Sequence, residues 1–285
     1  MNALVLGLRQ PTLADRLSPL LAGLRSRLER RSRQLVGFLD ARMDGLIVGW
    51  SLLLLAIGTF KVATALVPPS GLVGYLAIAF PYFLIILAPI AGYRLAKAAF
   101  PRGHAGGQPA FRFARLGKWH RLDWAEARTN RAFGPSGLLA SLLLGLLLDV
   151  PMRTLEYLGS VPAVGPEAPM WARIYFTAMT GQLVLLNFFG MVALVMALRN
   201  VPLFPRMLVF VWLFDLALQL GVAAQLSSAP DLPQIVAGPL ATLLENNIRK
   251  VLISMLVWLP YLLLSERVNV TYRQRASRSP AGQHA

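Results

Sequence analysis

Residues 137–157 read GLLASLLLGLLLDVPMRTLEY, and this run decides the medium in which the chain folds. An apolar run of about 20 residues forms a helix long enough to cross the roughly 30 Å of hydrocarbon in a bilayer. Within the run, small and ionisable residues recur at four-residue steps and share one helix face: Gly137, Ser141, Gly145, Asp149 and Arg153. Small residues allow helices to pack closely, and ionisable residues avoid lipid. We therefore expect this face to point into a helix bundle.

The composition of the whole chain also indicates a membrane protein. Its 285 residues are 56% hydrophobic and only 14% charged, whereas about a quarter of the residues of a typical soluble domain are charged. The formal net charge is nevertheless +15. The chain has no cysteine, which excludes disulfides, thiolate nucleophiles and iron–sulfur or cysteine-containing zinc sites.

Further apolar runs complete a set of six candidate transmembrane helices. We expect these helices at residues 45–67, 71–93, 137–157, 174–198, 207–226 and 248–264. Pro81 and Pro89 interrupt the second span and Pro151 the third, and we expect kinks there, since a membrane helix tolerates proline where neighbouring groups satisfy the freed carbonyl. The predicted fold is an all-α integral membrane protein, a six-transmembrane-helix bundle.

The cations predict how this bundle is oriented. Arginines gather in the segment 1–44, in the loop 94–136, in the short connection after the fourth span and in the tail 267–285. Segments rich in arginine and lysine stay in the cytoplasm, and these four fall on one side only if the number of spans is even. We therefore expect both termini in the cytoplasm of a bacterium, a transmembrane domain over residues 45–266 in the inner membrane, and a disordered basic tail.

Two amphipathic segments flank the predicted spans. Leucines recur at three- and four-residue steps between residues 13 and 43, and the arginines lie off that stripe: Arg16, Arg25, Arg27, Arg30, Arg31 and Arg33. This pattern is typical of a helix on anionic lipid headgroups, and the alternative is a helix packed on the cytoplasmic loop. Between Asp231 and Asn246 we expect a short interfacial helix before the last span.

The sequence contains no constellation that predicts catalysis. Arg131 and the segment Gly134-Pro135-Ser136-Gly137 resemble the serine loop of membrane lipid phosphatases, but Leu138 stands where the catalytic histidine would be. A serine without a base stays inert, so we expect Ser136 near the start of a helix. No metal-ligand spacing, phosphate-binding loop or strand pattern is visible. We expect no enzymatic activity, cofactor or metal, and we interpret the aromatic residues among the arginines of the loop 94–136 as headgroup contacts rather than a nucleic-acid site.

Polar side chains inside the predicted spans form the most informative set: Lys61, Asp149, Arg153, Glu156, Asn187, Asp215 and Gln219. An aspartate in hydrocarbon costs a few kcal/mol, and Arg153 with Glu156 would offset part of that cost. We expect the set to meet inside the bundle. One interpretation is a path for protons or a ligand, and the other, which we prefer, is a buried network that fixes helix register.

The last span ends in a motif that resembles a known family. The motif comprises Trp258, Pro260 and Tyr261, then Ser265, Glu266, Arg267 and Val268, and finally Thr271 and Tyr272. It is similar to the closing segment of the bacterial membrane-protein family called domain of unknown function 2569, although Glu266 replaces the usual lysine. The resemblance covers the motif well and spans three to six loosely. It implies a multi-helix inner-membrane protein and lends no mechanism.

These patterns together predict an accessory, assembly or lipid-contacting component of a membrane complex. Its expected partners are anionic lipid headgroups and other membrane proteins or a second copy of itself, with no nucleic acid. The alternative is a small transporter, proton-coupled or acting on lipid, that uses Asp149, Arg153 and Asp215.

Overall fold

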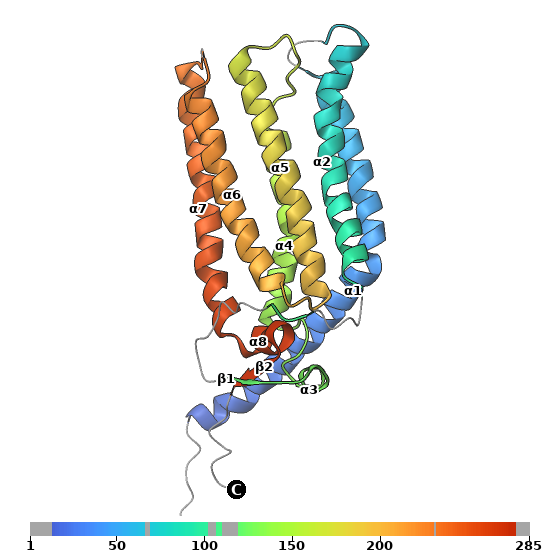
Figure 1. The fold of residues 1–285 in the computed structure, drawn as a ribbon, viewed down its shortest axis with the longest axis vertical. Coiled ribbons are helices and arrows are strands. Elements are labelled where there is room, and N and C mark those ends of the chain that lie inside the picture. Colours follow the sequence, from blue (N-terminus) through green and yellow to red (C-terminus); the bar gives the residue numbers. More distant parts are fainter. Residues whose placement is uncertain (1–12, 66–68, 102–106, 110–118, 231, 278–285) are drawn as a thin grey trace, which may run out of the picture.

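The computed structural model describes residues 13–65, 69–101, 107–109, 119–230 and 232–277. Within them, six helices are long and apolar enough to cross a membrane, as predicted. They stand side by side as a bundle (Figure 1). The helices are α1 (Leu13–Ala63), with its apolar part at Ala41–Ala63, α2 (Gly71–Ala99), α4 (Leu138–Ser160), α5 (Met170–Leu198), α6 (Phe204–Ser227) and α7 (Gln234–Leu264).

Helix α5 lies at the centre of the bundle and packs against α2, α4 and α6. It is the most deeply buried of the six helices, as expected of a helix with neighbours all around. Its closest approach is to α2, where a methyl group in place of the Gly92 hydrogen would lie 2.4 Å from the carbonyl oxygen of Phe188. The remaining helices lie outside, with α1 on α2 and α7 on α6.

The prolines stand inside helices that continue past them. Pro81 and Pro89 lie within α2, Pro151 within α4, and Pro239 with Pro260 within α7. The prediction of a separate interfacial helix between Asp231 and Asn246 is wrong. Those residues from Gln234 onward form the first turns of α7, since the helix runs through Pro239 without a break.

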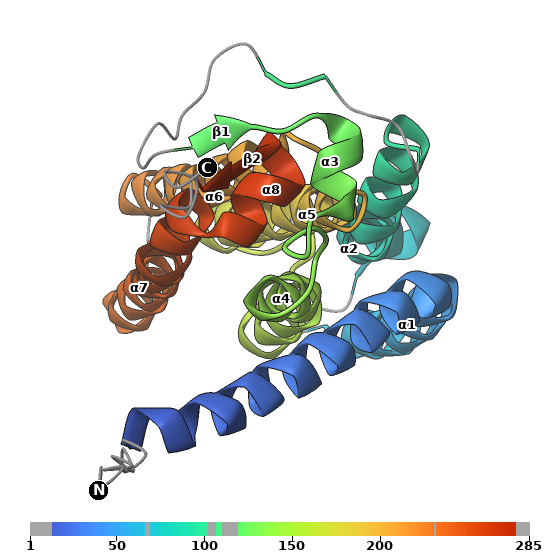
Figure 2. The same cartoon turned by 90° about the horizontal axis from the view of Figure 1, so that it is seen from below.

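The basic N-terminal segment is the first part of α1, which is a single helix of 51 residues. Seen from below, this part runs obliquely past α4 and away from the bundle (Figure 2). Arg27, Arg30 and Arg31 are exposed, whereas the side chains of Arg16, Arg25 and Arg33 lie outside the described residues. The hydroxyl oxygen of Ser32 accepts a hydrogen bond of 2.9 Å from the backbone N–H of Gly137, so α1 also contacts the start of α4.

A small cap covers the lower end of the bundle in Figure 1 and consists of β1 (Trp119–Arg121), α3 (Trp124–Thr129), α8 (Glu266–Arg273) and β2 (Arg275–Ser277). The strands pair antiparallel with Trp119 opposite Ser277. The sequence predicted neither these strands nor any order in the tail, yet Val268 and Tyr272 are fully buried. The prediction of a disordered tail is therefore wrong up to residue 277. Residues 278–285 lie outside the described part of the chain.

Hydrogen bonds tie the cap to the bundle and to the connection that precedes α4. The Tyr272 hydroxyl donates to the carbonyl oxygen of Ala197 at 3.0 Å, and the Thr271 hydroxyl accepts from the backbone N–H of Gly134 at 3.0 Å. The guanidinium of Arg267 donates to the hydroxyl of Ser136, which is buried just before α4. Arg267 therefore holds the connection before α4 in place.

Arg273 is another half-buried cation of the cap. It donates hydrogen bonds to the carbonyl oxygen of Leu262 at 2.8 Å and to the side-chain oxygen of Asn269 at 3.1 Å. Burial, together with the positive charges of Arg275 and Arg206, lowers the pKa of Arg273 to about 10. The underside of the bundle thus concentrates positive charge in a space that is partly closed to water.

Candidate functional site

A cavity of about 900 Å³ lies among α4, α5, α6 and α7. Ionisable side chains of α4 and α7 line it: Asp149, Arg153, Glu156 and Lys250. Its floor toward the cap is apolar and includes Leu146, Leu208, Trp212 and Trp258. The cavity therefore has a polar wall and an apolar floor within four helices that are long enough to span a membrane.

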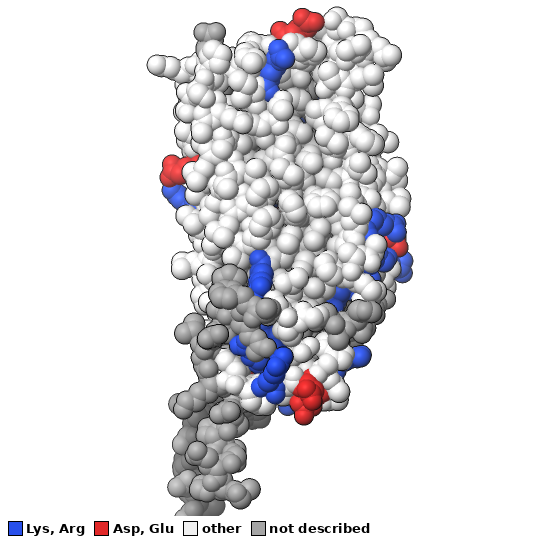
Figure 3. Space-filling view, viewed as in Figure 1, with Lys and Arg blue, Asp and Glu red and all other residues white. Residues whose placement is uncertain are grey.

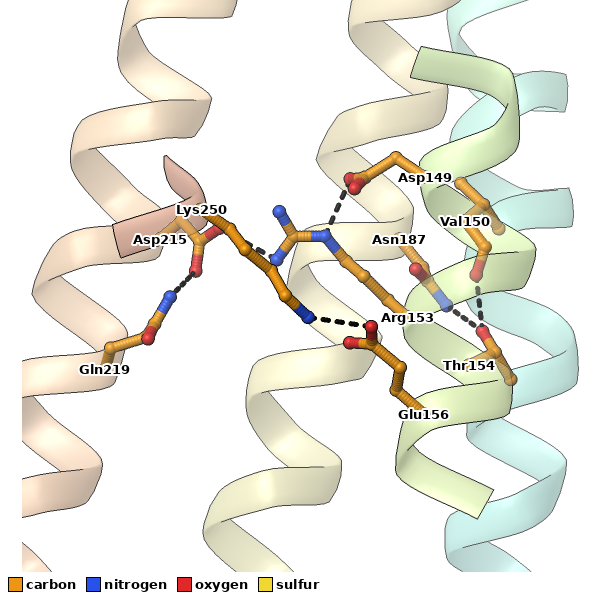
Figure 4. A network of polar contacts seen from close by, with 9 residues as sticks. All are labelled: Asp149, Val150, Arg153, Thr154, Glu156, Asn187, Asp215, Gln219 and Lys250. Carbon is orange, nitrogen blue, oxygen red and sulfur yellow. Dashed lines mark hydrogen bonds and ion pairs between the residues drawn. The ribbon is translucent and has the colours of Figure 1, made fainter. Parts of the chain in front are cut away.

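Arg153 is the centre of the polar wall (Figure 4). Its Nε atom lies 2.6 Å from Oδ2 of Asp149, one turn earlier on α4. Its Nη1 atom lies 2.8 Å from Oδ2 of Asp215 on α6. The side chain of Asp149 is 51% exposed and that of Asp215 only 1%, so one aspartate faces the cavity and the other is buried behind the arginine.

A glutamine supports the buried aspartate. Nε2 of Gln219 donates to Oδ1 of Asp215 at 2.8 Å, one turn along α6. Because a carboxylate can only accept, this hydrogen bond fixes which end of the Gln219 amide is the nitrogen. Asp215 is thus held from two sides, as a buried carboxylate requires.

A second ion pair closes the cavity between α4 and α7. Nζ of Lys250 lies 2.7 Å from Oε1 of Glu156, and both side chains are more than half exposed. Sequence reasoning expected Glu156 to act beside Arg153 and left Lys250 out of the polar core. No sequence signal could have found the pair, because it depends on the register between helices that are not adjacent along the chain.

The other predicted members of the core lie apart from Arg153. Nδ2 of Asn187 donates to the Thr154 hydroxyl at 3.0 Å, and that hydroxyl donates to the carbonyl oxygen of Val150. This contact joins α5 to α4 without an ionised group. Lys61 lies in the last turn of α1, and no contact found among the described residues links it to the network.

The ion network lies at mid-height in the bundle. With a rise of about 1.5 Å per residue, Asp149 stands roughly 16 Å from the first residue of α4, and Asp215 roughly 16 Å from that of α6. Two aspartates and one arginine give the network a net charge of −1 when all three are ionised. The Glu156–Lys250 pair is neutral as a pair, so the described ionisable groups around the cavity have one excess negative charge.

An apolar cavity of about 580 Å³ adjoins the first one toward the end of the bundle away from the cap. Its lining comes from the α4–α5 connection and the first turns of α7, and it shares Ser160, Pro239 and Leu243 with the polar cavity. A polar and an apolar cavity thus lie next to each other along α7.

The residues of the C-terminal motif divide between the cavity and the cap. Trp258 lines the cavity and packs edge-on against the ring of Tyr261, with centroids 5.9 Å apart. Pro260 lies inside α7, and Ser265 separates α7 from α8. Arg267 and Val268 belong to the cap. The motif thus marks the turn where the last long helix meets the cap.

The described part of the chain holds no group of three or more histidine, aspartate and glutamate side chains arranged to bind a metal ion. No protein-family model, no curated protein and no solved structure matches this chain. The class that the fold defines is therefore a helical bundle with six candidate membrane-spanning helices, and the resemblance of its last span to a known family stays a prediction.

Proposed function

We propose that this protein is a lipid-contacting component of a bacterial inner membrane that takes the polar group of an amphiphile into the cavity between α4 and α7. One observation carries the proposal: half-exposed charged side chains line a cavity at mid-height in helices that are otherwise apolar. Charged groups at such a depth face water, a partner or a polar ligand, since exposure to hydrocarbon is costly.

The adjoining apolar cavity supports an amphiphile over a wholly polar solute. Ligand sites are mostly apolar, with a few polar groups that fix orientation. Here the charged groups are confined to Asp149, Arg153, Glu156 and Lys250, and an apolar cavity adjoins the space that they line. A molecule with a charged group and a hydrocarbon chain matches both parts.

We also propose that the cap and both termini face the cytoplasm. Lysine and arginine side chains in the described residues are concentrated at the lower end of the bundle, whereas the middle of the face in view is mostly uncharged (Figure 3). This distribution agrees with the positive-inside rule. Reporter fusions at residues 119 and 278 should both report the cytoplasm and a fusion at residue 165 the opposite side. Fusions at 119 and 278 on different sides would overturn this topology.

Filling the cavity tests the proposed function. Gly145 lines it, and a Cβ atom added there meets nothing within 4 Å, so Gly145→Phe should extend into the space without displacing a neighbour's backbone. Gly181 on α5 is exposed, equally open and outside the cavity, which makes Gly181→Phe the matched control. Native mass spectrometry of gently purified protein should show one fewer bound lipid in Gly145→Phe only. Equal lipid retention in both variants would contradict the proposal.

A second candidate is a proton-coupled transporter, and it rests on Asp149 and Asp215 sharing one guanidinium. Such a site can exchange a proton as the arginine moves between two carboxylates. In that case Asp149→Asn and Asp215→Asn should abolish proton flux into proteoliposomes while the protein still inserts. Unchanged flux, or none in the wild type, would exclude it.

A further inference from the structure

Two amide oxygens on the cavity wall accept no hydrogen bond from any described residue. They are Oε1 of Gln219, on α6, and Oε1 of Gln182, on α5. The relative exposure of these residues is 0% and 8%, so bulk water does not substitute for a partner. Buried acceptors without a donor are rare and costly. The bond from Gln219 Nε2 to Asp215 fixes the Gln219 oxygen as the unpaired atom.

A partner for these two amide oxygens must be a hydrogen-bond donor. The net charge of the ion network indicates in addition that this donor is positively charged. Asp149, Arg153 and Asp215 leave one negative charge uncompensated. Asp149 is the acidic member of the network that a ligand can reach, because it lines the cavity and its side chain is half exposed. Trp212 and Trp258 line the same cavity, and indole faces attract cations. Acceptors, an accessible carboxylate and indole rings together match an ammonium group with N–H donors.

We propose that the polar group taken by this cavity is a primary ammonium within a zwitterionic phosphoamine headgroup. This inference rests on the proposed function and narrows its ligand. The ammonium lies at the Asp149 carboxylate, in the cavity that Gln219 and Gln182 also line, and the phosphate lies at Lys250. Lys250 is suited to this role because its ion pair with Glu156 is exposed, and exposed pairs are weak enough to exchange. An anionic headgroup without an amine would meet the excess negative charge with no positive charge to offset it.

The test compares lipids that differ only in the headgroup. Purified wild-type protein is delipidated and titrated with phosphatidylethanolamine, with its trimethylated analogue phosphatidylcholine and with phosphatidylglycerol of the same chains, and bound lipid is counted by native mass spectrometry. Phosphatidylethanolamine should bind about tenfold more tightly than either of the others, since methylation removes the N–H donors and glycerol removes the charge. Equal affinities for the three would overturn the inference and leave the proposed function standing.

Variants separate the cavity from the protein surface. Asp149→Asn should reduce the preference for phosphatidylethanolamine to less than about threefold. Lys250→Gln should weaken the binding of all three lipids, because all three carry the phosphate. Arg249→Gln should change neither, because Arg249 is adjacent in sequence but does not line the cavity. Unchanged preference in Asp149→Asn, or unchanged affinity in Lys250→Gln, would contradict the assignment. The headgroup comparison in the wild type keeps the test valid if a variant does not fold.

The same experiment distinguishes a lipid from a soluble amine. Glycerophosphoethanolamine has the same headgroup without hydrocarbon chains, so it should compete at least about 100-fold more weakly than the lipid, because burial of the chains is lost. Competition at equal concentration would overturn the amphiphile as ligand and assign the site to a soluble amine. If Gly145→Phe leaves the binding of all three lipids unchanged, the proposed function itself fails.

Discussion

Arg153 on α4 and Asp215 on α6 form an ion pair of 2.8 Å between two candidate membrane-spanning helices. The aspartate is buried, and its other oxygen accepts a hydrogen bond from Gln219. The same guanidinium holds Asp149 at 2.6 Å. One side chain therefore links α4 to α6 and also turns a carboxylate toward the cavity, so its structural and functional effects can be separated by mutating its two partners.

Removing the arginine should destabilise the bundle strongly. Arg153→Met leaves Asp215 buried without its cation, a change that typically costs about 3–5 kcal/mol. Asp149→Asn should cost less than about 1 kcal/mol, because the Asp149 carboxylate is half exposed and exposed pairs contribute little. The free energy of unfolding is measured by denaturant titration in detergent. The double variant Arg153→Met/Asp215→Leu should recover most of the loss, and an equally unstable double variant would contradict this explanation.

Gly92→Ala tests the contact between α2 and α5. The added methyl group would lie 2.4 Å from the carbonyl oxygen of Phe188, so the two helices must separate, at a cost of about 1–3 kcal/mol. Gly190→Ala is the control, since Gly190 is also buried in a helix but a methyl group there meets nothing within 4 Å. The control should be neutral or stabilising by up to about 1 kcal/mol. Equal melting temperatures for the two variants would show that α2 and α5 do not depend on this approach.

The spans could be predicted because hydrocarbon imposes one requirement on each helix alone, namely length and apolarity. The link from Asp149 to Arg153 was predictable for the same reason, because both residues lie on one helix and their spacing fixes their geometry. Asp215 was expected near them from depth, and the structure brings it to Arg153. Features that depend on one helix alone, such as its length and the spacing of its side chains, could therefore be predicted from the sequence.

The errors concern contacts between segments distant along the chain. Lys250 was left out of the predicted polar set, but the packing of α7 brings it to Glu156. The tail looked disordered because of its arginines, yet Val268 and Tyr272 are buried in the hydrophobic core at this end of the bundle. The strand β2 has no pattern of its own, because three residues that pair with a distant loop carry no periodic signal. Tertiary context decides each of these features.

Tyr272→Phe should loosen the cap in a pH-dependent way. It removes the hydrogen bond to the carbonyl of Ala197 but keeps the ring contact with Phe204, so it should cost about 1 kcal/mol at neutral pH. Burial raises the pKa of Tyr272 well above its ordinary 10.0, and the stability from this tyrosine is therefore full below pH 10 and falls as the pH rises above it. The difference between the wild type and Tyr272→Phe should shrink above pH 10. Protease sensitivity of the C-terminal segment measures it, and a difference constant with pH would contradict the burial of the hydroxyl.

The absence of cysteine from the chain allows the gap between α4 and α7 to be probed with introduced cysteines alone. Glu156 and Lys250 meet across this gap at 2.7 Å, so Glu156→Cys/Lys250→Cys should be bridged rapidly by a short bifunctional thiol reagent. Glu156→Cys/Arg249→Cys is the control, because Arg249 pairs with Glu245 on its own helix and does not line the cavity. Gel mobility after proteolysis of the loop between the two positions reports the cross-link. Because the bridge closes the side of the cavity, the cross-linked protein should also release and take up lipid more slowly than its reduced form. Equal cross-linking rates in the two pairs would show that α4 and α7 do not meet through these side chains.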